Sequence, residues 1–177
     1  MELWITEQQN ENVSFTCRVK KTIYSEKTDF QEIDIVETEY FGKMMVLDGV
    51  IQTTTFDEFI YHEMIVHVPM FAHPNPRKVL VIGGGDGGSV REITKHKNVE
   101  KVDWVDIDGG VIEACKTYMP EWNRMIQGNP VVELKIQDGL KHMKESQGQY
   151  DIIVVDCSDP VGPGELLFRY DFYKDIY

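Results

Sequence analysis

The chain has 177 residues, 42% of them apolar, and its 30 acidic and 18 basic side chains give a formal net charge of −12. This composition excludes a disordered chain and argues against a nucleic-acid surface, which needs a basic stripe. The three cysteines form no C-x-x-C pair, so neither a disulfide framework nor a zinc site is predicted. Because the sequence shows no signal peptide and no apolar run near the ~18 residues of a membrane span, we expect a cytoplasmic protein without membrane contact.

The first 55 residues alternate between apolar and polar side chains. Residues 13–25, 30–42 and 43–54 show this period of two and many β-branched residues, which is typical of antiparallel strands with one wet face. Asp48-Gly49 predicts a two-residue hairpin turn, because such turns need positive φ angles. We therefore expect a small N-terminal β-domain over residues 1–55.

Residues 56–68 have the pattern of a helix. The apolar side chains that recur at helical spacing are Phe59, Ile60, Met64 and Val68. The stretch from Thr55 to Glu58 matches a capping box at the start of the helix. Pro69, followed by "HPNPRK", predicts the end of the helix and a linker.

After this linker, short apolar runs alternate with helical segments. The apolar runs cover residues 78–83, 102–108, 131–138 and 150–156, with helical segments such as 89–96 and 111–119 between them. This alternation predicts βαβ units around a buried parallel sheet, so we assign residues 56–177 to a Rossmann-like, doubly wound domain. Because such sheets usually have five or more strands, we expect the chain to be the first part of a longer protein.

A glycine-rich loop follows the first of these runs, within "VLVIGGGDGGSV" from Val79. Gly83, Gly85 and Gly88 match the G-x-G-x-x-G pattern of dinucleotide-binding loops, and Asp106 ends the next strand where an acid would hold ribose hydroxyls. The loop equally matches G-x-G-x-G, the looser pattern of proteins that bind a nucleoside sulfonium. The glycine spacing alone is compatible with both ligands.

Asp86, in the middle of the loop, discriminates between these ligands. A carboxylate facing a pyrophosphate would cost on the order of a few kcal/mol at an effective dielectric constant near 20. Beside a sulfonium or an ammonium group the same charge is favourable. We therefore expect a cationic ligand.

Acidic residues follow all four predicted strands of this domain. They are Asp86, Asp106, Asp138, Asp156 and Asp159. Because ligands of open α/β sheets bind beyond the carboxyl ends of the strands, we expect these carboxylates to face one crevice. Asp138 is placed to accept a hydrogen bond from an adenine amino group, and Asp108 is equally consistent with a helix cap.

Several motifs together resemble the spermidine synthases of the polyamine aminopropyltransferase family. They are "FQEIDIVET", "YHEM", "GGGDGG" and "DCSDPVGP" with its following "ELLF", in the family's order over essentially all 177 residues. The resemblance implies a β-domain followed by a methyltransferase-like domain, and a homodimer or homotetramer. It implies transfer of an aminopropyl group from decarboxylated S-adenosylmethionine, as co-substrate, to putrescine, which yields spermidine and methylthioadenosine without a prosthetic group or a metal.

The resemblance also implies a role for each residue that matches a family motif. The nucleoside would be bound by Gln31, Gly83, Gly85, Asp106, Asp138, Gly139 and Pro163, the last beside the adenine. The amine groups would face Tyr61, His62, Asp86 and Asp159. Asp156 would also contact the amine and would be the base that activates the attacking nitrogen. Cys157 departs from the family pattern, which usually has a small hydroxyl residue there.

Two other functions remain open at the level of sequence. One is a methyltransferase that uses S-adenosylmethionine itself, although the carboxylate of that ligand would meet Asp86. The other is a non-catalytic paralogue or fragment that binds the nucleoside or a polyamine without turnover. The presence of Asp156 favours an enzyme.

Overall fold

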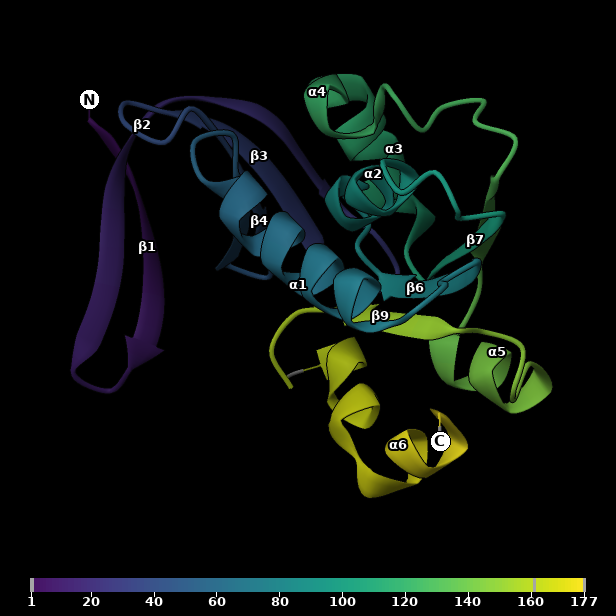
Figure 1. Cartoon of the computed structure of the whole chain (residues 1–177). Helices are drawn as coiled ribbons and strands as arrows, with labels where there is room; N and C mark the ends of the chain where they lie inside the picture. Colours follow the sequence, from purple (N-terminus) through teal and green to yellow (C-terminus); the bar gives the residue numbers. More distant parts are fainter. Residues whose placement is uncertain (1, 161, 177) are drawn as a thin grey trace. The chain divides into compact units, whose positions relative to one another are not determined.

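The computed structural model describes residues 2–160 and 162–176, and it divides into two compact units, residues 1–58 and 59–177. The N-terminal unit is a five-stranded antiparallel sheet in the order β1-β2-β3-β4-β5 (Figure 1). Its strands are β1 (Leu3–Asn10), β2 (Val13–Lys27), β3 (Glu32–Thr38), β4 (Lys43–Leu47) and β5 (Val50–Thr54). The strand β1 was not among the predicted elements.

The central strands of this sheet bury apolar side chains on both faces. One face buries Cys17, Val19, Val36, Met44 and Val46. On the other face Ile33, Ile35 and Met45 are also buried, so the prediction of one wet face is wrong for β3 and β4. The turn between β4 and β5 confirms the predicted hairpin, since Asp48 and Gly49 have φ angles of 49° and 81° and Leu47 pairs with Val50. The two ends of the meander also meet, because Glu7 Oε2 accepts the Ile51 N–H at 3.1 Å.

The second unit is built on a four-stranded parallel sheet in the order β8-β7-β6-β9. The strands are β6 (Lys78–Gly83), β7 (Lys101–Asp106), β8 (Val132–Ile136) and β9 (Ile152–Asp156). The helices are α1 (Glu58–Ala72), α2 (Gly88–Thr94), α3 (Gly109–Tyr118), α4 (Pro120–Asn123), α5 (Gly139–Glu145), the 3-10 helix η1 (Gly162–Phe168) and α6 (Tyr170–Ile176). This arrangement confirms the predicted Rossmann-like sheet, in which apolar side chains point to both faces.

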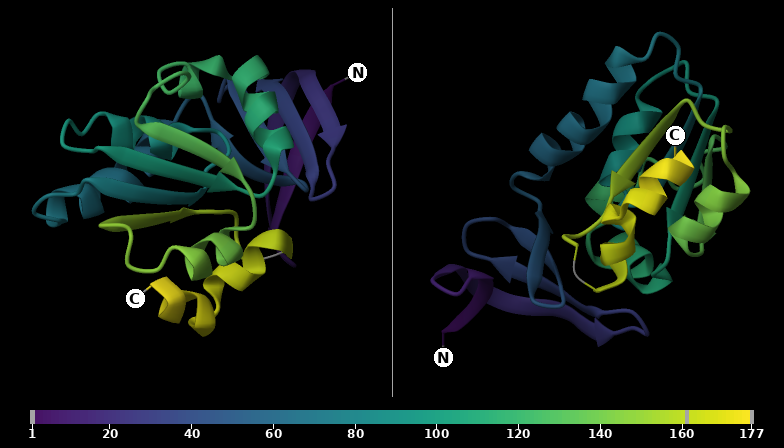
Figure 2. Two further views of the ribbon diagram at one scale, coloured as in Figure 1. Left: turned by 90° about the vertical axis from the view of Figure 1, so that its right-hand side faces the viewer. Right: turned by 90° about the horizontal axis from the view of Figure 1, so that it is seen from below.

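Helices cover both faces of the parallel sheet (Figure 2). Side chains of α1, α2 and α3 pack on Val79, Val81 and Trp104 on one face. Side chains of α5, η1 and α6 pack on Leu80 and Ile82 on the other face. None of the helices within residues 2–160 and 162–176 is long and apolar enough to cross a membrane.

The boundaries of α1 differ from those predicted. The helix runs through Pro69 to Ala72, so the prediction that it ends at Pro69 is wrong. Proline removes one N–H donor but does not stop the turn that follows it, and the next residue, Met70, is buried in the core. The predicted capping box is also wrong, because the Thr55 hydroxyl accepts the Lys43 N–H at 3.0 Å and extends the pairing of β4 and β5.

The buried face of α1 is not the one its apolar spacing predicts. The buried residues are His62, Val66 and Met70. The predicted apolar face, Phe59, Ile60, Met64 and Val68, is 49–62% exposed. Helical spacing shows which apolar residues share a face, but it does not show whether that face packs on the sheet. In α1 the buried face is the one that carries His62.

Candidate active site

The carboxyl ends of three neighbouring strands meet at one edge of the parallel sheet. Gly83 ends β6 and is paired with Asp156, which ends β9, while Asp106 ends β7 on the other side of β6. Parallel strands all point the same way, so residues at their ends necessarily lie at one edge. The sheet therefore brings together acids that lie 50 residues apart in the chain, Asp106 and Asp156.

The glycine loop lies directly against the end of β9. The Gly84 N–H donates to the Asp156 carbonyl oxygen at 2.6 Å, which holds the loop on the strand. Gly83 has a φ of 82°, and a β-carbon there would collide with the same carbonyl oxygen. A β-carbon on Gly84 would lie 2.8 Å from Asp156 Oδ2. Gly83, which was predicted, and Gly84, which was not, thus have a local reason, because a side chain at either position would displace Asp156.

The Asp156 carboxylate is held by two hydroxyl groups. The Tyr61 hydroxyl donates to Oδ1 at 2.9 Å and the Ser89 hydroxyl donates to Oδ2 at 2.6 Å. Burial and the nearby Asp86 charge raise the pKa of Asp156, and these two hydrogen bonds oppose that rise. The result is a fixed carboxylate with a greater proton affinity than an aspartate in water.

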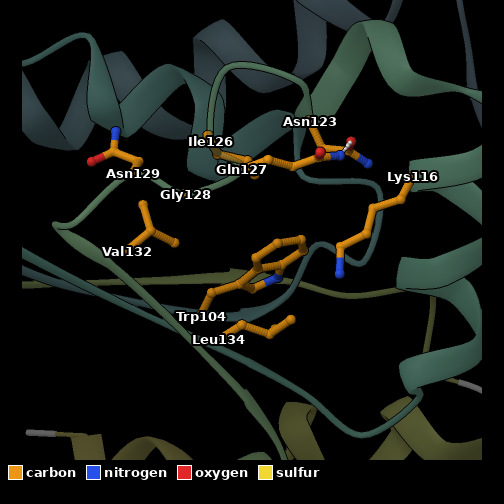
Figure 3. Close-up of a pocket in the computed structure, with 9 residues that line it drawn as sticks. All are labelled: Trp104, Lys116, Asn123, Ile126, Gln127, Gly128, Asn129, Val132 and Leu134. Atoms are coloured by element: carbon orange, nitrogen blue, oxygen red, sulfur yellow. Dashed lines mark hydrogen bonds between the residues drawn. The ribbon is translucent and has the colours of Figure 1, made fainter.

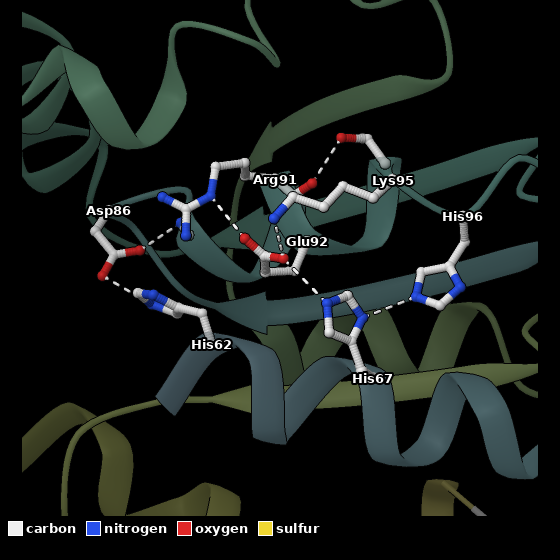
Figure 4. A network of polar contacts seen from close by, with 9 residues as sticks. His62, His67, Asp86, Arg91, Glu92, Lys95 and His96 are labelled. Carbon is white, nitrogen blue, oxygen red and sulfur yellow. Dashed lines mark hydrogen bonds and ion pairs between the residues drawn. The ribbon is translucent and has the colours of Figure 1, made fainter. Parts of the chain in front are cut away.

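His62 and Asp86 form a buried pair (Figure 4). His62 is 2% exposed, and its Nε2 lies 3.3 Å from Asp86 Oδ2. Asp86 Oδ1 accepts the Gly88 N–H at 2.7 Å. A β-carbon on Gly88 would collide with the His62 ring, so the absence of a side chain makes room for the imidazole. The predicted residues His62 and Asp86 are therefore in direct contact.

Asp106 is electrostatically linked to the same group of acids. Burial, together with the charges of Asp108, Asp156 and Asp86, raises the pKa of Asp106 to about 7, although the Asp108 N–H lowers it by donating to Oδ1 at 2.8 Å. Asp108 itself caps α3, because its side chain accepts the Gly110 N–H at 2.9 Å. The cap interpretation of Asp108 is thus confirmed, and Asp86, Asp106 and Asp156 form one cluster of carboxylates.

Of the other predicted residues, only Gly85 is in contact with a member of this cluster among the described residues. The Asp138 side chain caps α5 by accepting the Leu140 N–H at 2.8 Å, and Gly139 lets α5 approach Ile82 closely. Asp159 is exposed in the loop that follows β9. Three further residues are Gln31, in the turn before β3 of the N-terminal unit; Gly85, packed between Val111 and Asp106; and Pro163, whose side chain lies outside the described residues. Their roles in binding remain predictions.

Two buried residues near the cluster were not predicted. Ser89 is fully buried and contacts Asp156, and Asn123 is fully buried with its side-chain amide 3.5 Å from the Asp86 carbonyl oxygen. The position of Ser89 directly after "GGGDGG" was a usable signal, because a hydroxyl at the end of a ligand loop can reach a neighbouring strand. The sequence around Asn123 contains no comparable signal.

A second polar network joins α1 to α2, at residues of α1 that follow His62 in the chain (Figure 4). Glu92 is 1% exposed and accepts hydrogen bonds from Lys95 at 2.5 Å and Arg91 at 2.8 Å. His67 lies 3.1 Å from Glu92 and 2.9 Å from His96. Burial raises the pKa of Glu92, but the hydrogen bonds from Lys95 and Arg91 outweigh it and lower the pKa overall. This network secures α1, the helix that carries Tyr61 and His62.

A pocket of about 350 Å³ lies beside α3, α4 and β8 (Figure 3). It is lined by Trp104, Lys116, Asn123, Ile126, Gln127, Gly128, Asn129, Val132 and Leu134. This lining contains none of the predicted site residues and no carboxylate. Among the described residues, no group of three or more His, Cys, Asp or Glu side chains is arranged to hold a metal ion.

Comparisons with known proteins agree with this architecture. Residues 58–177 match the family model of the spermine/spermidine synthase domain, and residues 3–55 match that of the spermidine synthase tetramerisation domain. The polyamine aminopropyltransferase of Methanocaldococcus jannaschii is 56% identical over 175 residues, which are 99% of this chain and 59% of that protein. That of Shouchella clausii is 53% identical over 176 residues, 99% of this chain and 64% of its own.

Solved structures show the same likeness. A crystal structure of spermidine synthase in complex with the transition-state analogue AdoDATO matches with a TM-score of 0.95 and 43% identity, over 99% of this chain and 60% of that one. Spermidine synthase from Thermotoga maritima matches with a TM-score of 0.92 and 42% identity, over 99% and 59%. The chain thus spans 59–64% of the length of these relatives.

Proposed function

Because this chain belongs to the spermine/spermidine synthase family, we propose that the protein transfers an aminopropyl group from decarboxylated S-adenosylmethionine to putrescine. The products are spermidine and methylthioadenosine. The observation that carries this proposal is the cluster formed by Asp106 and Asp156, which end β7 and β9, and Asp86 in the loop that follows β6. Three carboxylates in one place suit two cationic substrates, since each positive charge relieves the repulsion among the acids.

The reaction is a displacement at carbon. The nitrogen lone pair of putrescine attacks the methylene carbon bonded to the sulfonium, and a carbon–nitrogen bond forms as the carbon–sulfur bond breaks. The electron pair of the broken bond stays on sulfur, which leaves as a neutral thioether, and the proton released from the nitrogen goes to Asp156. The protein contributes mainly alignment of amine, carbon and sulfur.

The protonation state of the substrate amine decides how much of the proton removal Asp156 must perform. An aspartate near its usual pKa faces a gap of about 6 units to an alkyl ammonium, or about 8 kcal/mol. Burial raises the pKa of Asp156 and so narrows the gap, whereas the Asp86 charge raises the pKa of Asp156 and that of a nearby ammonium alike. The sulfonium charge favours loss of the ammonium proton, which narrows the gap from the other side.

We assign the remaining predicted residues to substrate binding. Asp106 holds the ribose, and Asp138 and Gly139 hold the adenine. Tyr61, His62, Asp86 and Asp159 face the amines. The support for these roles is that Tyr61 donates a hydrogen bond to Asp156 and that His62 contacts Asp86, whose charge acts on Asp156.

The test is incubation of the protein with decarboxylated S-adenosylmethionine and putrescine, followed by mass spectrometry of both products. We expect spermidine and methylthioadenosine in equal amounts, with both formed about 10²–10⁴-fold more slowly by the Asp156→Asn variant. S-adenosylmethionine as donor is the parallel arm. A methylated acceptor in that arm would establish the methyltransferase alternative, and binding of methylthioadenosine without turnover in either arm would establish a non-catalytic binding protein.

We also propose that the protein is a homo-oligomer. The support is the match of residues 3–55 to a model described as a tetramerisation domain. Sedimentation velocity at micromolar concentration is expected to give a dimer or a tetramer. A single species of 20.5 kDa would contradict this proposal.

A further inference from the structure

Ser89 contacts the candidate base from inside the protein. It lies in the first turn of α2, has no solvent exposure, and donates its hydroxyl hydrogen to Asp156 Oδ2 at 2.6 Å. We infer that Ser89 is a positioning residue for the proposed aminopropyl transfer: its hydroxyl fixes the orientation of the Asp156 carboxylate and stabilises its negative charge. This inference rests on the proposed function of Asp156 as the base.

The two donors to Asp156 come from different helices and bind different oxygens. Tyr61, on α1, donates to Oδ1 at 2.9 Å. Ser89, on α2 and without solvent exposure, donates to Oδ2 at 2.6 Å. With Oδ2 anchored by a buried hydroxyl the carboxylate is held in one orientation, and Oδ1, which accepts one hydrogen bond, retains a second lone pair for the proton that is transferred.

The local needs of α2 do not explain this serine. The helix has no side-chain hydrogen bond at its N-cap, and the Ser89 hydroxyl is directed to β9 instead of to its own backbone. Alanine is the better helix former and would fill the same place in a buried first turn. The hydrogen bond to Asp156 is therefore the feature that distinguishes serine from alanine at this position.

The surroundings of Asp156 make a donor necessary. The titratable groups around it are Asp86, Asp106, His62, Tyr61 and Cys157. Burial and the Asp86 charge raise the pKa of Asp156, and the Ser89 hydrogen bond is the strongest of the interactions that oppose this rise. Without this donor, Asp156 would keep its proton to higher pH and would be a base over a narrower range.

The test is a titration of Asp156 by carboxyl carbon-13 NMR, in protein labelled at its aspartates. Loss of the signal in Asp156→Asn assigns it. We expect Ser89→Ala to raise the pKa of Asp156 by about one unit, the size of a lost hydrogen bond to a charged group, and Ser89→Thr to keep the wild-type value. Ser146→Ala is the matched control, because it also removes a buried hydroxyl, one that donates to the His142 carbonyl oxygen at 2.6 Å. It should leave the titration of Asp156 unchanged.

Three results would overturn the inference: an unchanged pKa in Ser89→Ala, a threonine variant that titrates like the alanine variant, or an equal shift in Ser146→Ala. The titration needs no substrate, so it decides the role of Ser89 on the carboxylate even if the protein transfers no aminopropyl group. In turnover assays of Ser89→Ala, the acidic limb of the pH profile of kcat should move by the same number of pH units, while the Kd for methylthioadenosine stays constant. A purely structural role for Ser89 would instead lower the melting temperature and leave that limb in place.

Discussion

Tyr61 donates its hydroxyl hydrogen to Asp156 Oδ1 at 2.9 Å, although 95 residues separate the two in the chain. Tyr61 lies on α1 and Asp156 ends β9, so the contact forms only when the helix is packed beside the sheet. Burial and the Asp156 charge raise the pKa of Tyr61, which keeps the hydroxyl protonated and therefore a donor at neutral pH.

The first prediction concerns the base. Asp156→Asn keeps the shape of the side chain and its hydrogen-bonding capacity but removes the proton acceptor. We expect kcat to fall by about 10²–10⁴, with the Kd for methylthioadenosine nearly unchanged. Steady-state kinetics and calorimetry measure the two quantities. Normal turnover of this variant would exclude Asp156 as the base.

The second prediction separates Asp159 from Asp156. Asp159 is exposed and lies three residues beyond the end of β9, so we expect it to anchor an amine charge and not to transfer a proton. Asp159→Asn should mainly raise the KM for putrescine, because ground-state and transition-state binding are lost together. A variant with unchanged KM and abolished kcat would show that the roles of the two aspartates are reversed.

The third prediction concerns the choice of nucleoside. Asp86 in the glycine loop repels the carboxylate of intact S-adenosylmethionine by at least ~1–3 kcal/mol. The decarboxylated form should therefore bind roughly tenfold to a hundredfold more tightly, and Asp86→Asn should reduce this preference. Calorimetry with both ligands measures it. Equal affinities for the wild-type protein would remove the electrostatic argument from Asp86.

The fourth prediction is a stability effect at Asp106, whose pKa is raised to about 7. Between the ordinary aspartate pKa near 4 and this value, the folded state keeps a proton that the unfolded state has lost, so stability falls as pH rises through this range. Asp106→Asn resembles the protonated form and should raise the melting temperature at pH 8. Its advantage should grow from about pH 4 to about pH 7 and then level off.

Thermal unfolding at pH 4, 6 and 8 measures this difference, and nucleoside affinity is measured in parallel. We expect the asparagine variant to be more stable and to bind methylthioadenosine more weakly. The side-chain carbonyl of the asparagine can still accept the Asp108 N–H, so the substitution does not remove this hydrogen bond and mainly removes the charge. A loss of stability that is equal at all three pH values would contradict the assignment of the raised pKa to Asp106.

The fifth prediction concerns Gly83. Gly83→Ala places a β-carbon at a φ of 82° against the Asp156 carbonyl oxygen, so we expect a loss of stability above the ~1–2 kcal/mol of a left-handed residue, and weaker activity. Gly109→Ala is the control, because its β-carbon would lie 3.6 Å from Ile136, an ordinary contact. Urea unfolding compares the two. Equal effects would show that close approach to Asp156 is unimportant.

Local patterns predicted the β-meander, the parallel sheet and the acids at the strand ends. The reason is physical: strands alternate with a period of two, and parallel strands must end at one edge, so Asp106 and Asp156 are placed together by topology alone. The Asp48-Gly49 turn is equally local, because positive φ angles restrict the choice of residue.

The side of α1 that is buried, the passage of that helix through Pro69 and the contacts of Ser89 depend on packing between distant segments. Burial of His62 is favourable because Gly88 leaves space for its ring and Asp86 provides its partner, and neither condition can be seen in the sequence of α1. The same holds for the pKa of Asp106, since desolvation and neighbouring charges arise only after β6, β7 and β9 are side by side. Periodicity describes one element at a time, whereas the free energy of a buried charge depends on all the elements around it.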